Sequence, residues 1–224
     1  MYIYGKNAVS EVDVKQIKKA FVYKKFSDKN LLNKLINNNI EIKYLDKQDL
    51  DKIASGNHQG VILETEDYKY ADLDTIEKGN IIVMLDHLED PHNFGAIIRT
   101  CEAAGIKNII IPKDRSVKVN GTVSKTSAGT INNVNIAVVS NLVNTIKELK
   151  EKGYWVIGTD MEGTDYKKID YSGNIVIVIG NEGKGISRLV KENCDFIATI
   201  PMYGKVNSLN ASVAAALIIY EAVR

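Results

Sequence analysis

Three segments of this 224-residue sequence place polar side chains directly after an apolar run. They span residues 86–100, 180–187 and 200–212, and they carry histidines, carboxylates, carboxamides and the arginine Arg99. Such groups bind a substrate, orient it and exchange protons with it, provided that the fold brings them together. The chemistry therefore depends on where the three segments lie in the fold.

The second segment, which begins Gly180-Asn-Glu-Gly-Lys-Gly, is rich in glycine and suggests a nucleotide-binding turn. It fails the Walker pattern because Gly185 is followed by Ile186 where that pattern requires lysine. It also fails the pattern G-x-G-x-x-G, since Arg188 stands at the last glycine position. Glu182 lies between glycines after the most apolar run, where the backbone approaches a ligand closely. The alternative is a tight turn that only leads into a helix.

The first segment contains candidate metal ligands, namely His87, Glu89, Asp90 and His92. They fall in a turn, without the histidine spacing of i and i+4 that zinc proteases use on a helix. The sequence shows no further clustered ligand elsewhere. We therefore expect no metal site.

The remaining polar residues of the first and third segments have two interpretations each. Asn93 suits a helix cap after Asp90-Pro91, and Arg99 suits a solvated helix position. Ser208 or Asn210 suits the cap of the final helix. Residue types alone leave these roles open, but three segments rich in polar and charged side chains in one chain favour a functional site.

Hydrophobic patterning predicts alternating strands and helices throughout. The predicted strands are 20–23, 40–45, 61–63, 81–86, 109–112, 134–139, 155–160, 175–180 and 196–201. The predicted helices are 28–39, 46–54, 93–105, 142–152 and 209–223. Residues 1–66 form a small α/β domain, the polar stretch 67–79 is a linker, and residues 80–224 form the larger domain. Its continuous apolar strands predict an α/β fold with a mostly parallel sheet, where ligands bind at the carboxyl ends of the strands.

The composition is that of a globular protein, with 45% hydrophobic and 25% charged residues and a net charge of +1. The start has no signal-peptide pattern, and no apolar run is long enough to cross a membrane, so we expect a cytoplasmic protein. Cys101 and Cys194 are far apart, which favours reduced thiols, and Cys101 suits the core.

The three segments together resemble the motifs of the SpoU (TrmH-like) methyltransferases of the SPOUT superfamily. The motifs are DPHNFGAIIRTCEAAG at 90–105, IVIGNEGKGIS at 177–187 and IPMYGKVNSLNASVAAAL at 200–217. The N-terminal part, with GKNAV at 5–9 and GNHQGV at 56–61, is similar to the substrate-binding domain of RlmB-type enzymes, which resembles an RNA-binding ribosomal protein.

This resemblance implies a deep trefoil knot in the C-terminal domain, a homodimer, and S-adenosylmethionine as methyl donor without a metal. It assigns the cofactor to Gly180, Ile200, Ser208 and Leu209. It assigns the chemistry to Asn93, Arg99, Glu182 and Asn210.

The implied activity is methylation of a ribose 2′-hydroxyl in structured RNA. A guanosine of large-subunit (23S) ribosomal RNA is the favoured target, with transfer RNA as the alternative. A non-catalytic RNA-binding protein of the same fold is a further alternative. Lys18, Lys19, Lys24 and Lys25 form either a phosphate-facing patch or a solvated face.

Overall fold

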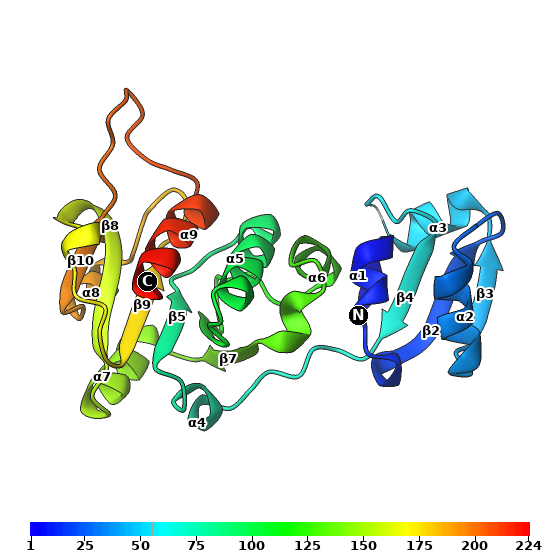
Figure 1. Ribbon diagram of the computed structural model, residues 1–224, viewed down its shortest axis with the longest axis horizontal. Helices are drawn as coiled ribbons and strands as arrows, with labels where there is room; N and C mark the ends of the chain where they lie inside the picture. Colours follow the sequence, from blue (N-terminus) through cyan, green and yellow to red (C-terminus); the bar gives the residue numbers. More distant parts are fainter. Residues whose placement is uncertain (55) are drawn as a thin grey trace. The chain divides into compact units, whose positions relative to one another are not determined.

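The computed structural model describes residues 1–54 and 56–224. Its contacts divide the chain into two compact units (Figure 1). The first contains Met1–Lys69 and Lys118–Asn132, and the second contains Tyr70–Val117 and Asn133–Arg224. The boundaries expected from the sequence at 66, 67–79 and 80 stay a prediction. By contact, residues 118–132 belong with the first unit, which the sequence pattern does not reveal.

The first unit is built on a four-stranded sheet in the order β1-β4-β2-β3, of which only β2 and β3 pair in parallel. Its strands are β1 (Tyr2–Tyr4), β2 (Ile17–Tyr23), β3 (Ile42–Leu45) and β4 (Val61–Thr65). Its α-helices are α1 (Lys6–Ser10), α2 (Lys29–Asn37), α3 (Lys47–Ile53) and α6 (Gly121–Thr126). Short 3₁₀ turns lie at η1 (Val14–Gln16) and η2 (Thr130–Asn133), the latter at the boundary between the units.

Local sequence accounts for most of these elements. In β2 the buried residues Ala20 and Val22 alternate with partly exposed ones, as expected when one face of a sheet packs on a core. The side chain of Asp28 accepts a hydrogen bond from Leu31 N and so begins α2. The predicted strands and helices of this unit are confirmed, whereas β1 is too short to show a period.

The segment 118–132 packs on β1 through Gly121, and the close approach of the β1 backbone explains why a glycine stands at this position. A Cβ on Gly121 would lie 2.0 Å from Tyr2 O, so no other residue fits this close approach. Further along, the Tyr4 hydroxyl and Thr122 Oγ1 lie 3.4 Å apart. Lys125 Nζ donates to Asn57 O at 2.9 Å. These contacts hold α6 against the first unit.

The second unit contains a six-stranded sheet in the order β10-β8-β9-β5-β6-β7, and every pair in it is parallel. The strands are β5 (Ile81–Leu85), β6 (Asn108–Pro112), β7 (Asn135–Val139), β8 (Trp155–Asp165), β9 (Ile175–Ile179) and β10 (Phe196–Thr199). The helices are α4 (Leu73–Ile76), α5 (Pro91–Ala103), α7 (Leu142–Glu151), α8 (Arg188–Glu192) and α9 (Ala211–Ala222), with a 3₁₀ turn η3 (Tyr166–Lys168). The predicted α/β fold with a parallel sheet is confirmed.

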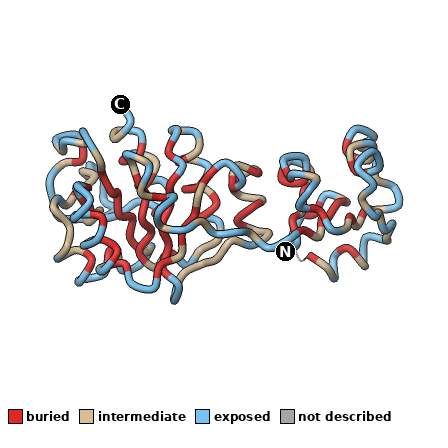
Figure 2. Tube along the Cα trace, turned by 90° about the horizontal axis from the view of Figure 1, so that it is seen from below, coloured by how far each residue is buried: buried red, intermediate tan, exposed pale blue. Residues whose placement is uncertain are grey.

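Helices cover both faces of this sheet. Met84 of β5 and Val178 of β9 share a core cluster with Leu149 of α7 and Val190 of α8. Neighbouring strand residues point to the opposite face, where α5 and α9 pack against each other and α9 contacts β9 (Figure 1). Figure 2 shows the central strands as the most continuously buried part of the trace. The motif segments therefore rest on a rigid base.

Several element bounds differ from those that the sequence predicts. Helix α5 begins at Pro91 rather than at residue 93, because Asp90 caps it by accepting hydrogen bonds from His92 N and Asn93 N. Strand β8 runs on to Asp165. The stretch predicted as a linker contains α4, whose Ile76 is fully buried. The trefoil knot stays a prediction.

Candidate functional site

The first two motif segments meet because they follow neighbouring strands. Leu85 at the end of β5 lies opposite Ile179 at the end of β9. In a parallel sheet these carboxyl ends share one edge, and a crevice forms where the chain order reverses. The third segment follows β10, the outermost strand of the sheet, and leads into α9. Helix α9 packs on α5 and β9. All three segments lie within the second unit.

Asn210 fixes the direction of a chain of side-chain hydrogen bonds. Its Oδ1 accepts from Ser212 N at 2.9 Å and from Val213 N at 3.4 Å, and so it caps α9. Since backbone N–H groups only donate, this oxygen must face the helix, and Nδ2 must face away from it. That Nδ2 donates to Asn93 Oδ1 at 3.0 Å. The cap and the functional contact therefore belong to one carboxamide.

Asn93, whose amide is oriented by Asn210, in turn orients the carboxylate of Glu182. With its Oδ1 occupied by Asn210, its Nδ2 donates to Glu182 Oε1 at 2.8 Å. Asn93 is buried and free for this role because Asp90 caps the helix in its place. Glu182 is exposed, and its Oε2 has no hydrogen-bond partner among the described residues. The arrangement presents one oriented carboxylate oxygen at the edge of the sheet.

Asp86 attaches the turn that carries Glu182 to the end of β5. This fully buried carboxylate accepts from Ser187 N and from His87 Nδ1, each at 2.5 Å. Asn181 Nδ2 donates to His87 O at 2.8 Å across the same gap. Sequence reasoning considered His87 only as a metal ligand and missed Asp86, although a carboxylate directly after a buried strand was the available signal.

Gly180 permits the turn to close on itself. Asn181 and Gly185 exchange two backbone hydrogen bonds of 3.0 and 2.9 Å. A Cβ on Gly180 would lie 2.2 Å from Gly185 C and 2.4 Å from Ile186 N. The glycine is therefore required by the backbone that lies against it, whatever its role toward a ligand.

Arg99 is the predicted catalytic residue that lies apart from this cluster. It comes six residues after Asn93 on α5, so the two side chains leave the helix about 120° apart. Arg99 is exposed and forms no hydrogen bond or ion pair with Asn93, Glu182 or Asn210. The structure thus brings together three of the four predicted catalytic residues.

The predicted cofactor residues outside the turn lie on the segment before α9. Ile200 is half-buried, and Leu209 is 37% exposed. Ser208 Oγ donates to Asn207 Oδ1 at a long 3.4 Å. Residues 201–209 form no backbone hydrogen bond with any described residue. Their main-chain donors and acceptors, together with the apolar side chains, are open to a ligand.

Other predicted features concern thiols, metals and membranes. Cys101 is fully buried, as predicted, and burial raises the pKa of its thiol to about 12. Within residues 1–54 and 56–224 we find no group of three side chains placed to hold a metal ion. No described helix has the length and apolar character that a bilayer crossing requires.

The fold and the site define a parallel α/β protein in which a hydrogen-bonded chain of two carboxamides and one carboxylate lies at the carboxyl ends of the strands. Sequence comparison then identifies the family. The SpoU rRNA Methylase family matches residues 80–220, and the domain described as RNA 2'-O ribose methyltransferase substrate binding matches residues 2–71. The chain belongs to the SpoU family, which confirms the resemblance of its three motifs.

Two of the similar proteins cover the whole chain, and a third covers two thirds of it. YacO of Bacillus subtilis, assigned to the TrmH family of tRNA/rRNA methyltransferases, is 43% identical, covering 100% of this chain and 95% of YacO. The crystal structure of the SpoU methyltransferase AviRb from Streptomyces viridochromogenes, in complex with AdoMet, has a TM-score of 0.84 at 25% identity and covers 100% of this chain and 89% of AviRb. The TrmH/SpoU tRNA modifying enzyme of A. aeolicus has a TM-score of 0.60 at 33% identity and covers 67% of this chain and 80% of that enzyme.

Proposed function

We propose that this protein transfers a methyl group from S-adenosylmethionine to a ribose 2′-hydroxyl of RNA. The observation that carries the proposal is the hydrogen-bonded chain from Asn210 through Asn93 to Glu182, formed by the three motif segments at one sheet edge. Family membership and the AdoMet complex of AviRb support the choice of donor. We assign RNA selection to residues 1–66 and methyl transfer to residues 80–224, joined by 67–79.

The residues predicted to hold the donor suit its chemistry. Ile200 and Leu209 offer apolar surface for an adenine ring, and the unpaired main-chain groups of 201–209 suit its polar edge. Gly180 lets the backbone of its turn fold closely on itself beside the end of β9, and Ser208 adds a hydroxyl. Bound S-adenosylmethionine supplies an electrophilic methyl group on a sulfonium. No metal is required for this reaction.

Arg99 and Glu182 act on the acceptor in this proposal. A ribose hydroxyl is a weak nucleophile until its proton is removed or polarised. The guanidinium of Arg99 anchors the RNA phosphate and polarises the hydroxyl, because a side chain with a pKa above about 12 is a poor proton acceptor. Proton acceptance by Arg99 is the alternative. Glu182, held by Asn93, orients the ribose or the guanidinium.

Arg99→Lys distinguishes these roles from simple positive charge. A lysine keeps the charge but lacks the planar fork that grips phosphate through two hydrogen bonds. We expect a large loss of kcat/KM with unchanged affinity for S-adenosylmethionine in calorimetry. Near-full activity of this variant would reject both the bidentate and the proton-accepting role.

The favoured substrate is a guanosine of large-subunit ribosomal RNA. The matching family is described as an rRNA methylase, and the match to the tRNA modifying enzyme leaves a third of this chain uncovered. The substrate-binding match at residues 2–71 supplies a further RNA-recognising unit. Transfer RNA is the alternative substrate, because YacO is assigned to a family of tRNA/rRNA methyltransferases.

Mapping of ribose methylation tests the activity and the substrate together. Ribosomal and transfer RNA from cells with and without the gene are compared, and purified protein is then given labelled S-adenosylmethionine and each unmodified RNA. We expect one ribosomal guanosine to lose its 2′-O-methyl group in the deletion and to regain it in vitro. A site in transfer RNA would select the alternative substrate. RNA binding without any methyl transfer would indicate the non-catalytic alternative.

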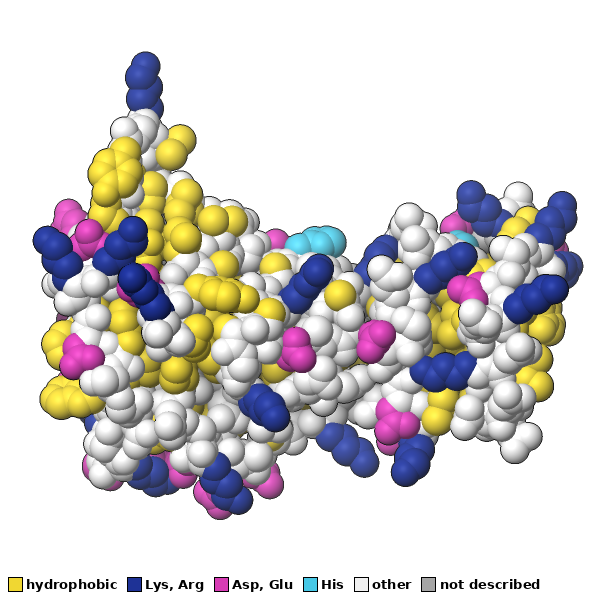
Figure 3. All heavy atoms as spheres, in the orientation of Figure 1, with side chains coloured by type: hydrophobic (Ala, Val, Ile, Leu, Met, Phe, Trp, Pro, Cys, Tyr) yellow, Lys and Arg dark blue, Asp and Glu magenta, His cyan; other side chains and the backbone are white. Residues whose placement is uncertain are grey.

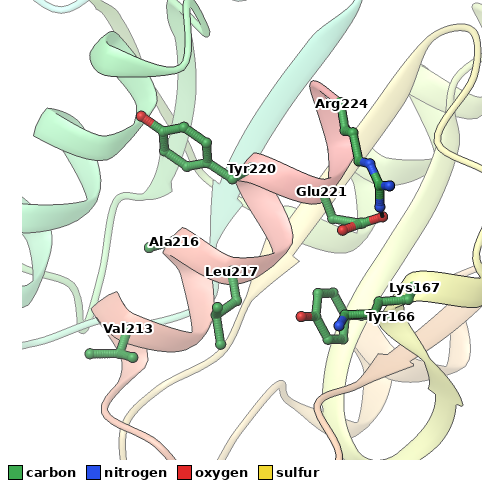
Figure 4. A pocket seen from close by; sticks show the side chains of 8 residues that line it. All are labelled: Tyr166, Lys167, Val213, Ala216, Leu217, Tyr220, Glu221 and Arg224. Carbon is green, nitrogen blue, oxygen red and sulfur yellow. Dashed lines mark hydrogen bonds and ion pairs between the residues drawn. The ribbon is translucent and has the colours of Figure 1, made fainter.

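We further propose that the protein is a homodimer that pairs through α9. Ala215, Ile218 and Ile219 bury one side of this helix. Val213 and Tyr220 on its other side are 48% and 52% exposed, which is unusual for a helix that is apolar all round. Figure 4 shows the side chains along this face, which line a pocket of about 520 Å³.

A charge at the centre of this face tests the dimer. Leu217 is 39% exposed on α9, so Leu217→Asp changes little in the isolated subunit but places a carboxylate in the proposed interface. We expect a monomer in sedimentation, with methyl transfer lost. Leu189→Asp on α8, at a leucine that is 54% exposed, is the matched control and should leave the dimer intact. A dimeric Leu217→Asp protein would reject this interface.

A further inference from the structure

The first unit contains a pocket that the proposed chemistry does not use. It has a volume of about 490 Å³, within the range of about 300–1,000 Å³ that is common for ligand sites. The loop 56–60 forms one wall, and Tyr23 at the end of β2 and Phe26 after it form another. The lysines Lys6, Lys25 and Lys47 also line the pocket. Figure 3 shows lysine side chains distributed over this unit, whose residues 1–69 are drawn in blue and cyan in Figure 1.

The wall formed by loop 56–60 is held in one shape. His58 is buried, and its Nδ1 accepts from Gly60 N at 3.0 Å. Its Nε2 must therefore carry the proton, which it donates to Asp51 Oδ1 at 2.9 Å. Gln59 and Gly60 turn the chain at φ values of +51° and +83°. The pocket is formed before any ligand arrives, and the only carboxylate among its described lining residues, Asp51, already accepts a hydrogen bond from His58.

The pocket offers an aromatic surface and open donors. Phe26 is half-buried, and a Cβ on Gly60 would lie 3.1 Å from its ring, so the ring rests directly on this glycine. Lys6 Nζ lies 5.3 Å from the centroid of the same ring. Gln59 Oε1 accepts from Lys6 N at 2.8 Å, which leaves the amide hydrogens of Gln59 without a partner among the described residues.

Ion pairs divide the lysine patch that the sequence suggests, and Lys25 is the member of that patch that lines the pocket. In that patch Lys19 pairs with Glu41 and Lys24 pairs with Asp46, so half of its positive charge is already compensated. Lys25 and Lys47, which line the pocket, form no ion pair with any described carboxylate. The uncompensated charge therefore lies beside the aromatic ring, where it favours an anionic ligand with a flat apolar part.

We propose that this pocket binds one unstacked nucleotide of the RNA substrate, other than the nucleotide that is methylated. The base stacks on Phe26, the amide of Gln59 donates to its edge, and Lys25 and Lys47 contact the flanking phosphates. A paired base is held inside a helix and does not enter such a pocket, whereas loops and bulges expose their bases. The proposal rests on the proposed function for the identity of the RNA. It gives the first unit the role of recognising an unpaired nucleotide.

Variants of Phe26 test the stacking contact in the full-length protein. The probe is large-subunit ribosomal RNA from cells that lack the gene, and the readouts are RNA affinity by filter binding and the KM and kcat of methyl transfer. We expect Phe26→Leu to weaken RNA binding and raise the RNA KM by about fivefold to a hundredfold, as removal of one stacked base does. Phe26→Tyr keeps a ring and should retain the wild-type values. The kcat and the affinity for S-adenosylmethionine should not change in either variant.

Variants of the two lysines test the phosphate contacts without touching the core. Lys25→Ala combined with Lys47→Ala should lower the salt dependence of log K by about 0.7 for each phosphate that the protein no longer neutralises. Lys29→Ala combined with Lys43→Ala is the matched control, because these lysines are exposed in the same unit and lie outside the pocket. Equal effects of the two pairs would overturn the proposal in favour of diffuse attraction.

The outcomes separate this proposal from the proposed function. If the wild-type protein methylates RNA and Phe26→Leu keeps the wild-type KM and affinity, the pocket does not bind a nucleotide. If the wild-type protein transfers no methyl group, the proposed function fails, and filter binding still decides the role of the pocket. Equal losses for Phe26→Tyr and Phe26→Leu at unchanged thermal stability would also overturn stacking as the cause.

Discussion

Replacing Asn210 by aspartate separates its two roles, because only one of them needs the carboxamide nitrogen. The new carboxylate still accepts from Ser212 N and Val213 N, and aspartate caps helices about as well as asparagine. It offers no donor to Asn93 Oδ1, so the Asn93 amide turns to donate to it instead. That rotation points Asn93 Oδ1 at Glu182, and the 2.8 Å hydrogen bond to the glutamate is lost.

The expected effects on activity and on stability differ in magnitude and are measured in separate assays. A hydrogen bond to a charged group contributes about 1.5–3 kcal/mol, which corresponds to a fall in kcat/KM of about 10- to 150-fold if Glu182 must be oriented in the transition state. Thermal stability should stay within about 0.5 kcal/mol of the wild type, as for a surface substitution that keeps its cap. Asn210→Ala should lose the same activity and, in addition, about 1 kcal/mol of stability, or about 2–4 °C in Tm.

Labelled methyl transfer and thermal unfolding measure these quantities on the same preparations. Asn141→Asp is the matched control, because Asn141 caps α7 by accepting from Asn144 N and is exposed. We expect that control to keep both activity and Tm. Full activity of Asn210→Asp at an unchanged Tm would refute the claim that the hydrogen bonds from Asn210 through Asn93 orient Glu182.

Two further predictions concern the core and the turns. Gly180→Ala should destabilise the protein by about 1–3 kcal/mol and weaken binding of S-adenosylmethionine in calorimetry, because its Cβ would lie 2.2 Å from Gly185 C; an unchanged affinity would contradict the role of this turn. The unfolded chain releases the Cys101 proton near pH 9, whereas burial holds the pKa of the folded thiol at about 12. The folded state therefore binds more protons in this window, and the free energy of unfolding should fall as the pH rises from about 9 toward 12. Urea titrations of the wild type and Cys101→Ala measure this, and an equal fall in both would exclude Cys101 as its cause.

The parallel sheet is predictable from sequence because its signal is local. The runs Ile81–Leu85 and Ile175–Ile179 are continuously apolar, and such strands are typical of a sheet buried on both faces. The beginning of α5 was equally accessible, since Asp90 followed by Pro91 is a standard helix start. The predicted start at residue 93 overlooked it.

The features that sequence reasoning missed depend on contacts between distant residues. Gly121 is required by Tyr2 O, which lies more than a hundred positions earlier in the chain. The link from Asp86 to Ser187 likewise spans 101 positions. The motif resemblance supplied Asn93, Glu182 and Asn210 as a group, but the direction of their hydrogen bonds follows only from the cap of α9.

The packing of Lys118–Asn132 with Met1–Lys69 means that the chain passes between its two units three times, after residues 69, 117 and 132. Cutting the chain at one peptide bond to remove Met1–Lys69 would leave α6 in the remaining fragment. Gly121 would then lack strand β1, which it contacts at Tyr2. Transfer of the first unit to another protein would therefore require Met1–Lys69 and Lys118–Asn132 to be exchanged together.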